Sequence, residues 1–512
     1  MLTRRHFIAG AAATAFAAPA IIRAQTVFRA YPFSLGVASG DPSPDGFVIW
    51  TRLAPEPLEQ HGGMAMAPMT VSWEVTADEA FRNRVAQGEA VARPELGHSV
   101  HVEVAGLQPD RPYWYRFQIP GERSIHGHAR TLPLASASPE RLSFGVCGCQ
   151  SYPDGYYTAH RHLAEEELAF VYHYGDYIYE YRGGPTRRGR QGELIVAVRE
   201  VAGDTLYSLD DYRRRYAQYK ADPDLQRAHA AHAFFHSFDD HEIADNWTQD
   251  TDWDEIPPEI FRLRRAAALQ AWYEHMPVRR ALMPRHGEVR MHRAVRVGNL
   301  AEIDILDTRQ YRSNQPCRDG FTPVCQEIEA ANATILGAEQ EAWLMRNLQR
   351  NPARWNCLAQ QIMMMSIDRN NWDDSGRVLN MDTWAAYEAP RRRLLARMAG
   401  LNNVVVLTGD EHQNFAGLLH DRDRPVAAEF VATSISSGGD GADRREGSDR
   451  ILANNPQIRF INDQRGYLTC DVTPNEWRTN YMVVDRVSTP GGSLSKRATL
   501  AMTRGEVALR EV

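Results

Sequence analysis

Residues 142–181 read LSFGVCGCQSYPDGYYTAHRHLAEEELAFVYHYGDYIYEY, and this stretch decides the fold of the larger part of the chain. An apolar run at 142–147 precedes a helical pattern near 156–167, and a second apolar run follows at 168–175. Apolar strands that alternate with helices form sheets whose parallel strands are covered on both faces. We therefore expect an α/β domain to begin here.

The same alternation continues toward the C-terminus. Helical patterns lie at 209–220 and 258–274. Further strands are expected at 233–238, 300–306, 357–365 and 404–409. From Tyr467 onward the chain reads as β-hairpins with a turn at PGGS, a pattern that would complete a sheet edge.

The part of the chain before residue 142 has a different sequence pattern, in which turns separate short β-rich runs. The runs lie at 46–53, 69–76, 98–107, 111–119 and 129–133. The turn and aromatic strand in GLQPDRPYWYRF are typical of a fibronectin-like corner in a small β-sandwich. With 512 residues the chain is long enough for two domains. We place the sandwich at 25–135 and the α/β catalytic domain at 136–512.

The first 24 residues, MLTRRHFIAGAAATAFAAPAIIRA, indicate a twin-arginine signal peptide with Arg4 and Arg5 as the pair. The alternative is a short amphipathic or buried helix. Export by the twin-arginine translocase would deliver the protein to the periplasm or outside the cell. No later apolar run approaches the roughly 18 residues of a membrane span, so we expect no stable membrane anchor.

The net charge bears on the possible partners, and the cysteines bear on a possible disulfide. Loss of the three signal-peptide arginines changes the formal net charge from -7 to -10, which argues against nucleic acid as a partner. Export permits disulfides, and Cys317 and Cys325 flank a short polar stretch. We favour a bridge between them, worth roughly 2 to 3 kcal/mol, over two free thiols.

Four predicted strands end in residue types that bind metals. In an open α/β sheet, ligands bind beyond the carboxyl ends of the strands. Carboxylates buried together there would repel one another unless cations compensate, so we expect a site with several metal ions. In chain order the residues are Cys149, Asp176, Tyr179, Asp239, Asp240, His241, Asp410 and His412.

Each of these residues alone has a simpler interpretation, as a turn, a structural histidine or a small buried side chain. The order GD (175–176), DDHE (239–242) and GDEH (409–412), on separate strands, favours the metal site. That order resembles the plan of the calcineurin-like metallophosphoesterases. A closer resemblance is carried by SGDPSPDGFVIWTRL (39–53), CQSYPDGYYTAHRHLAEEELAFVYHYGDYIYEY (149–181), DDHEIADNW (239–247), LDTRQYR (306–312) and LTGDEHQNF (407–415).

These stretches resemble the PhoD-like alkaline phosphatase family over most of the chain that follows the signal peptide. The resemblance implies a metallophosphoesterase domain of layered sheets flanked by helices, preceded by a small all-β sandwich. It implies metal-dependent hydrolysis of phosphate esters, small molecules among them, with phosphomonoesterase and phosphodiesterase activity both open. It also implies ferric iron (Fe3+) together with calcium (Ca2+).

Carried over residue by residue, the resemblance makes Cys149 and Tyr179 iron ligands, Asp176 a bridge between iron and calcium, and Asp410 a further metal ligand. A thiolate and a phenolate suit a strongly Lewis-acidic transition metal, whereas calcium prefers carboxylate and carbonyl oxygens such as those of Asp240. Whether Asp239 or Asp240 is the direct ligand stays open.

Cys147 lies two residues from Cys149, and in a continuous strand both would share a face. The family pattern places the ligand just before Gln150, and a break at Gly148 would turn Cys147 into the core.

The expected reaction is in-line attack on a phosphate ester by a metal-activated oxygen, which needs no Ser or Thr nucleophile. His241 and His412 would ligate or hydrogen-bond, and either could protonate the leaving group. Arg309 and Arg312 are candidates for orienting the phosphate. An ion pair with a nearby acid such as Asp307 is equally expected. The loop SSGGDGADRRE (436–446) is assigned no catalytic role.

Three rival functions remain at this stage. A phospholipase D-like phosphodiesterase cannot be separated from a phosphatase by sequence. An exported redox metalloprotein is disfavoured because no CxxCH haem motif or iron–sulfur cysteine run is present. A non-catalytic binding protein built on a sandwich would leave the ligand residues at the strand ends unexplained.

Overall fold

The computed structural model describes residues 28–188, 194–252, 256–350, 353–370 and 376–512. The expected signal peptide at 1–24 lies outside these ranges. None of the described helices is long and apolar enough to cross a membrane.

Two large mixed sheets form the centre of the molecule. In sheet order, the ten-stranded sheet contains β26 (Arg510–Glu511), β25 (Leu494–Thr503), β24 (Glu476–Val484), β23 (Gly466–Val472), β9 (Leu142–Cys147), β10 (Val171–His173), β13 (Ala233–His236), β1 (Val37–Ser43), β2 (Gly46–Arg52) and β5 (Ser99–Val104). The seven-stranded sheet contains β14 (Arg293–Val297), β15 (Ala301–Ile305), β17 (Trp355–Ala359), β19 (Val404–Thr408), β21 (Arg424–Val431), β20 (Asn414–Asp421) and β22 (Ile458–Asn462).

Each large sheet has a parallel centre. The strands β9, β10, β13 and β1 run parallel in the first sheet, and β15, β17, β19 and β21 run parallel in the second. The expected C-terminal hairpins are β23 to β26, and they complete one edge of the ten-stranded sheet. Parallel strands bring their carboxyl ends to the same edge of a sheet. The candidate ligands come shortly after these strand ends in the sequence.

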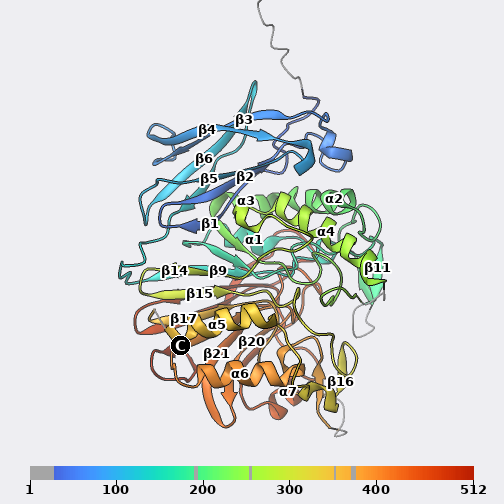
Figure 1. Ribbon diagram of the computed structural model, residues 1–512, viewed down its shortest axis with the longest axis vertical. Coiled ribbons are helices and arrows are strands. Elements are labelled where there is room, and N and C mark those ends of the chain that lie inside the picture. The colour runs from blue at the N-terminus through green and yellow to red at the C-terminus, as the bar shows by residue number, and fades with distance from the viewer. Residues whose placement is uncertain (1–27, 189–193, 253–255, 351–352, 371–375) are drawn as a thin grey trace, which may run out of the picture.

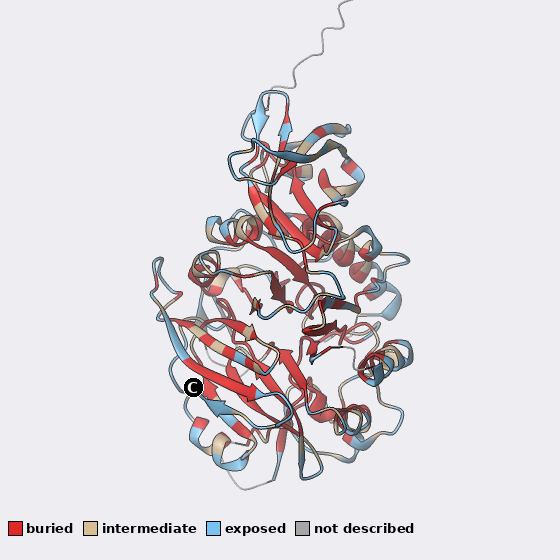
Figure 2. Ribbon diagram, turned by 90° about the vertical axis from the view of Figure 1, so that its left-hand side faces the viewer, coloured by how far each residue is buried: buried red, intermediate tan, exposed pale blue. Residues whose placement is uncertain are grey.

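The two sheets pack face to face, and helices cover their outer faces. Phe144 and Tyr172 of the first sheet share one buried core with Cys357 and Val405 of the second. The helices are α1 (Thr158–Leu163), α2 (Leu209–Lys220), α3 (Pro223–Ala231), α4 (Pro258–His275), α5 (Gly337–Arg350), α6 (Glu388–Met398) and α7 (Ser448–Asn454). Residues of α1 to α4 pack on the ten-stranded sheet, and residues of α5 and α6 pack on the seven-stranded sheet. Figure 1 shows α4 and α6 on opposite outer faces, and Figure 2 shows how thoroughly the central strands are buried.

The N-terminal β region forms the expected sandwich, but one of its sheets is shared. Five strands form a separate sheet: β4 (Arg84–Ala92), β3 (Met69–Thr76), β6 (Pro112–Ile119), β7 (Glu122–Arg123) and β8 (Gly127–Arg130). This sheet packs on β1, β2 and β5 through a core that includes Val71, Tyr115 and Phe47. Because β1 also pairs in parallel with β13, with Ser39 opposite Ala233, the sandwich continues the large sheet of the α/β part.

Two expected elements are shorter in the structure. The strand expected at 357–365 is β17, which ends at Ala359, because Met363 to Met365 leave the sheet and pack in the core beside α6. The helix expected near 156–167 is α1, which covers only Thr158–Leu163. Two small antiparallel pairs complete the described strands: β11 (Thr186–Arg188) with β12 (Leu194–Val196), and β16 (Phe321–Pro323) with β18 (Val378–Asn380).

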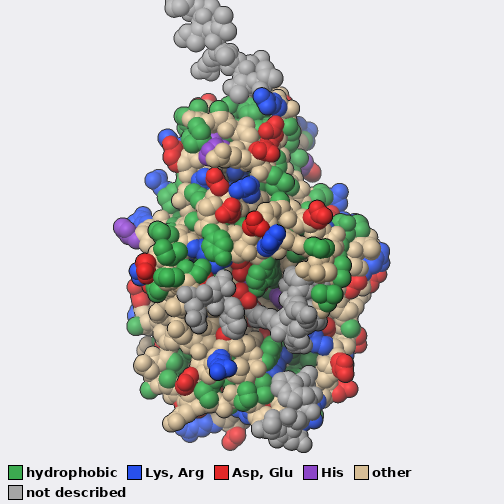
Figure 3. Space-filling model, turned by 90° about the vertical axis from the view of Figure 1, so that its right-hand side faces the viewer, with side chains coloured by type: hydrophobic (Ala, Val, Ile, Leu, Met, Phe, Trp, Pro, Cys, Tyr) green, Lys and Arg blue, Asp and Glu red, His purple; other side chains and the backbone are tan. Residues whose placement is uncertain are grey.

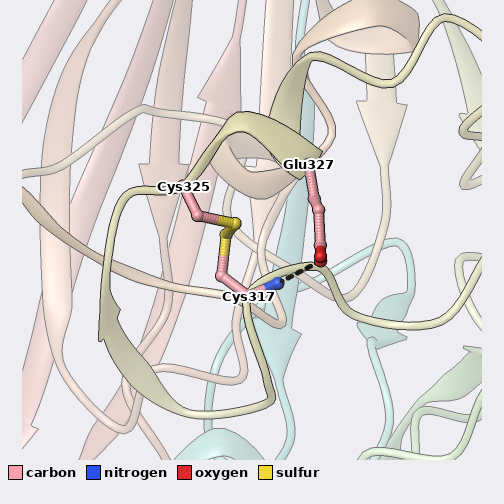
Figure 4. The surroundings of a disulfide bond; sticks show 3 residues. All are labelled: Cys317, Cys325 and Glu327. Atoms are coloured by element: carbon pink, nitrogen blue, oxygen red, sulfur yellow. Dashed lines mark hydrogen bonds between the residues drawn. A yellow bond between two sulfur atoms is a disulfide. The ribbon is translucent and has the colours of Figure 1, made fainter.

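The disulfide expected between Cys317 and Cys325 is present, with the two Cα atoms 5.8 Å apart. Figure 4 shows the bridge closing a surface loop, in which Glu327 accepts a hydrogen bond from the Cys317 backbone N–H at 2.9 Å. The other four cysteines are buried free thiols.

Candidate metal centre

The candidate ligands lie directly after the parallel strands and meet between the two sheets. Cys149 follows β9, Asp176 follows β10, and Asp410 and His412 follow β19. All four have positive φ angles, of 51°, 56°, 66° and 52° respectively. Non-glycine residues adopt this left-handed region only at an energetic cost, and such strain gathers at functional sites.

One group of ligand atoms gathers around the Asp176 carboxylate. Its Oδ2 lies 3.3 Å from Sγ of Cys149 and 2.9 Å from the phenol oxygen of Tyr179. The same phenol oxygen lies 3.2 Å from Nε2 of His412. Thiol, phenol, carboxylate and imidazole therefore converge at one point.

Asp176 also belongs to a second group. Carboxylate atoms of Asp176, Asp239, Asp240 and Asp410 all lie within 4.8 Å of one another. A third set of atoms at the same spacing joins Asp176 and Asp240 to His241. The sequence resemblance gave Asp176 the bridging position, and Asp176 is the residue that these three sets share.

The electrostatics of this cluster fit bound cations. Burial raises the pKa of Asp176 well above its usual range; His241 opposes this effect, and Asp240 adds to it. Burial, opposed by Arg309, raises the pKa of Asp239 to about 6. Oδ1 of Asp176 and Oδ2 of Asp239 are buried without a hydrogen-bond partner. Positive charge among these oxygens would stabilise the ionised carboxylates and supply the missing partners.

The same reasoning applies to the thiol of Cys149 and the phenol of Tyr179. Burial raises the pKa of the Cys149 thiol well above its usual range, and the nearby carboxylate of Asp176 raises it further. Burial and the same carboxylate raise the pKa of Tyr179. A thiol and a phenol must lose their protons to bind a metal, so a strongly charged ion is needed here.

Gly148 separates the two neighbouring cysteines. β9 ends at Cys147, whose side chain packs in the core beneath α1 to α4, while Cys149 points toward Asp176. A Cβ at position 148 would lie 2.3 Å from the Tyr174 ring, so only glycine fits there. Because of this break, Cys149 lies at the candidate site and Cys147 does not.

His241 is held from two sides. Its Nδ1 lies 2.8 Å from Oε2 of Glu180, and its ring stacks on that of Tyr179 with the centroids 4.1 Å apart. Burial lowers the pKa of His241, but Asp240 and Glu180 outweigh it and raise that pKa well above the usual value. Glu180 therefore orients the imidazole, and the neighbouring carboxylates favour its protonated form.

Arg309 and Arg312 are fully buried and pair with acids. Arg309 donates to Asp239 at 2.5 Å and to Asp382 at 2.7 Å. Arg312 lies 3.0 Å from Oδ1 of Asp382 and also donates to the Asp382 carbonyl oxygen. Asp307 instead accepts the Arg309 backbone N–H at 3.0 Å. The expected ion pairs exist, but not with Asp307: Arg309 pairs with Asp239 and Asp382, and Arg312 pairs with Asp382. The sequence analysis did not single out Asp382.

With this geometry described, comparison with known proteins places the chain in a family. Residues 144–481 match the family of PhoD-like phosphatases, and residues 17–133 match the N-terminal domain of PhoD-like phosphatases. The chain belongs to the PhoD-like phosphatase family. It is 44 % identical to alkaline phosphatase D of Bacillus subtilis (strain 168), over 99 % of this chain and 89 % of the relative. A solved structure of PhoD matches with a TM-score of 0.91 and 44 % identity, over 95 % of this chain and 93 % of that one.

These similarities confirm the predicted fold class and the predicted enzyme class, a hydrolase of phosphoric esters. The roles of the individual residues and the identity of the metals remain predictions. Figure 3 shows a hollow near the middle of one face of this PhoD-like phosphatase, with acidic side chains visible inside it.

Two further residues organise the site of this PhoD-like phosphatase, and sequence reasoning gave neither a role. Glu242 accepts backbone N–H groups from Asp176 at 3.1 Å, Tyr177 at 2.7 Å and Asp239 at 2.9 Å, so it ties two ligand loops together. The position of Glu242 in the DDHE motif (239–242) could have indicated a role at the site. Ser437 contacts Tyr179 from the loop after β21, and no sequence pattern marked it.

Proposed function

We propose that this PhoD-like phosphatase hydrolyses phosphate esters at a centre that binds ferric iron and calcium. The observation that carries the proposal is the convergence of a thiol, a phenol and a carboxylate, from Cys149, Tyr179 and Asp176. Thiolate and phenolate are donors suited to a transition metal rather than to calcium or magnesium. The activity of the Bacillus subtilis relative, named alkaline phosphatase D, supports the same conclusion.

In this proposal Cys149 and Tyr179 would hold the iron, and Asp176 would contribute its carboxylate to both metals. Asp240 and Asp410 supply oxygen ligands on the other side of Asp176, a donor type that suits calcium. Arg309 holds Oδ1 of Asp239 at 2.5 Å but lies 3.5 Å from Oδ1 of Asp240, so we favour Asp240 for direct ligation. Bound metals of this kind lower the pKa of water and stabilise charge on a phosphoryl group.

The chain's own residues then orient the substrate and move a proton. His412 is only partly buried and lies beside Tyr179, so its imidazole can reach the leaving oxygen of a bound ester. His241 is fixed by Glu180 and can donate a hydrogen bond to a phosphoryl oxygen. General acid catalysis by a positioned histidine typically contributes about 100-fold or more.

We assign Arg312 a positioning role. Its guanidinium is buried against Asp382, and Asp382 also holds Arg309, which in turn holds Asp239. This chain of ion pairs fixes the loop after β13. Removing one member of a buried pair leaves an uncompensated charge, so a substitution here should disturb the metal site without touching the substrate.

The proposal includes export. Arg4 and Arg5 direct the folded protein through the twin-arginine pathway to the periplasm or the medium, where it acts on small phosphate esters. We retain 25–135 as the sandwich and 136–512 as the catalytic domain.

The test is elemental analysis of the purified enzyme together with hydrolysis of 4-nitrophenyl phosphate. The proposal expects iron and calcium in stoichiometric amounts with activity. A preparation that hydrolyses the ester at full rate with neither metal would refute it.

A further inference from the structure

The loop that follows β21 runs beside the strand end that carries Cys149. The backbone N–H of Ile435 donates to the Gly148 carbonyl at 3.0 Å, and that of Ser437 donates to the Cys149 carbonyl at 3.3 Å. The side chain of Ser437 is fully buried. It therefore belongs to the interior of the site and not to an exposed loop.

The Ser437 hydroxyl has three neighbours. It accepts a hydrogen bond from the Ser151 backbone N–H at 3.0 Å and donates to the Cys149 carbonyl at 2.7 Å. The phenol oxygen of Tyr179 lies 2.7 Å away, and either oxygen can be the donor. One hydroxyl thus connects the phenol of Tyr179 with the backbone of Cys149, the two residues that we assign to iron.

A count of protons shows what changes when Tyr179 binds a metal. As a neutral phenol, Tyr179 donates its one proton to Asp176 at 2.9 Å, to Ser437 at 2.7 Å or to Nε2 of His412 at 3.2 Å. As a phenolate it has no proton and needs a donor. Ser437 carries one proton, and a rotation about its Cβ–Oγ bond moves that proton from the Cys149 carbonyl to the phenolate oxygen.

We propose that Ser437 is a positioning residue that donates a hydrogen bond to the metal-bound phenolate of Tyr179 and so tunes its electron donation to the metal. The inference rests on the proposed iron site. It adds a residue from the 436–446 loop, to which sequence reasoning gave no catalytic role. Hydrogen bonds to charged oxygens are shorter and stronger than those to neutral ones, so the contact strengthens when the proton leaves.

The backbone at this position does not depend on the hydroxyl. The Ser437 carbonyl accepts hydrogen bonds from Arg465 at 2.5 Å and from the Ser434 hydroxyl at 2.7 Å. The next residue, Gly438, donates its N–H to Asp154 at 2.9 Å. Ser437→Ala should therefore keep the loop in place while removing the donor.

The experiment compares Ser437→Ala with a matched control, Ser436→Ala. Ser436 is equally buried and its hydroxyl donates to the Ser151 carbonyl at 2.8 Å, so it has the same surroundings but a different partner. Purified holoenzymes are measured for iron content, iron dissociation constant, visible absorption and hydrolysis of 4-nitrophenyl phosphate. Ser437→Thr restores a hydroxyl and provides the rescue.

A donated hydrogen bond withdraws electron density from a phenolate, and its loss lowers the energy of phenolate-to-iron charge transfer. We expect the visible band of Ser437→Ala to move to longer wavelength and its iron dissociation constant to rise about tenfold, as for loss of a charge-assisted hydrogen bond. Ser436→Ala should keep the wild-type band, and Ser437→Thr should return toward it.

Two results overturn the inference, and they are distinguishable. A coloured wild type whose band is unchanged in Ser437→Ala refutes the role of Ser437 and leaves the iron site standing. A wild type without iron or visible absorption refutes the iron site and the role of Ser437 with it.

Discussion

His232 provides a test of how burial shapes the pH dependence of this fold. It ends α3, is 5 % exposed, and its Nε2 lies 3.0 Å from the Leu163 carbonyl oxygen, to which it can donate a hydrogen bond. Burial lowers the pKa of His232 to about 4, against 6.5 for an exposed histidine, although the bond to Leu163 opposes the shift. Between these two values the unfolded chain binds a proton that the folded chain does not.

The free energy of unfolding therefore falls as the pH is lowered through this window. For one group with these two pKa values, acidification from about pH 7 to about pH 5 costs about 2 kcal/mol. Glutamine keeps an N–H donor for Leu163 but does not titrate, so His232→Gln should lose about 2 kcal/mol less than wild type over the same change.

The assay is urea denaturation of both proteins at the two pH values, with the calcium concentration fixed. The quantity compared is the difference between His232→Gln and wild type, because loss of metal at low pH then cancels. A surface control, His126→Gln, is expected to follow wild type. If wild type and His232→Gln lose the same stability on acidification, the burial argument is wrong.

Three further predictions concern the proposed metal site and the expected signal peptide. Exhaustive EGTA treatment should abolish hydrolysis and added Ca2+ should restore it, because carboxylate sites bind calcium reversibly; full activity after EGTA would contradict the calcium assignment. Asp176→Asn should lower kcat by about 100-fold or more, because it removes the charge shared by the two metal positions; wild-type turnover would show that the site is misplaced. Replacing Arg4 and Arg5 together with lysine should leave active enzyme in the cytoplasm, as measured by fractionation, and normal export of that variant would exclude the twin-arginine route.

The fold class could be predicted from sequence because apolar strands alternating with helices leave few architectures. The pairing of β1 with β13 could not, because nothing in either strand records a partner almost 200 residues away. The sequence pattern also failed at the end of β17, which ends at Ala359, because apolar residues resume at Ile362 after two glutamines and were assigned to the same strand. Burial in a sheet and burial beneath a helix give the same apolar sequence.

The candidate site, like the fold, could be predicted from sequence only in part. Asp176 and Asp410 could be placed because parallel strands bring their carboxyl ends together. Asp382, which pairs with Arg309 and Arg312, follows β18, a three-residue strand that the sequence analysis did not predict, and it approaches the two arginines only through tertiary packing. Ser437 is a further such case, since a serine in a glycine-rich loop has no local mark of its contact with Tyr179.

The most direct test of the iron centre is the visible spectrum and iron content of wild type beside Tyr179→Phe, with activity measured on the same samples. A phenolate on ferric iron absorbs visible light, whereas calcium and zinc sites are colourless. The account predicts a coloured, iron-containing wild type, and a Tyr179→Phe variant that folds, loses the phenolate band and hydrolyses 4-nitrophenyl phosphate more slowly. A colourless, iron-free wild type with full activity would contradict it.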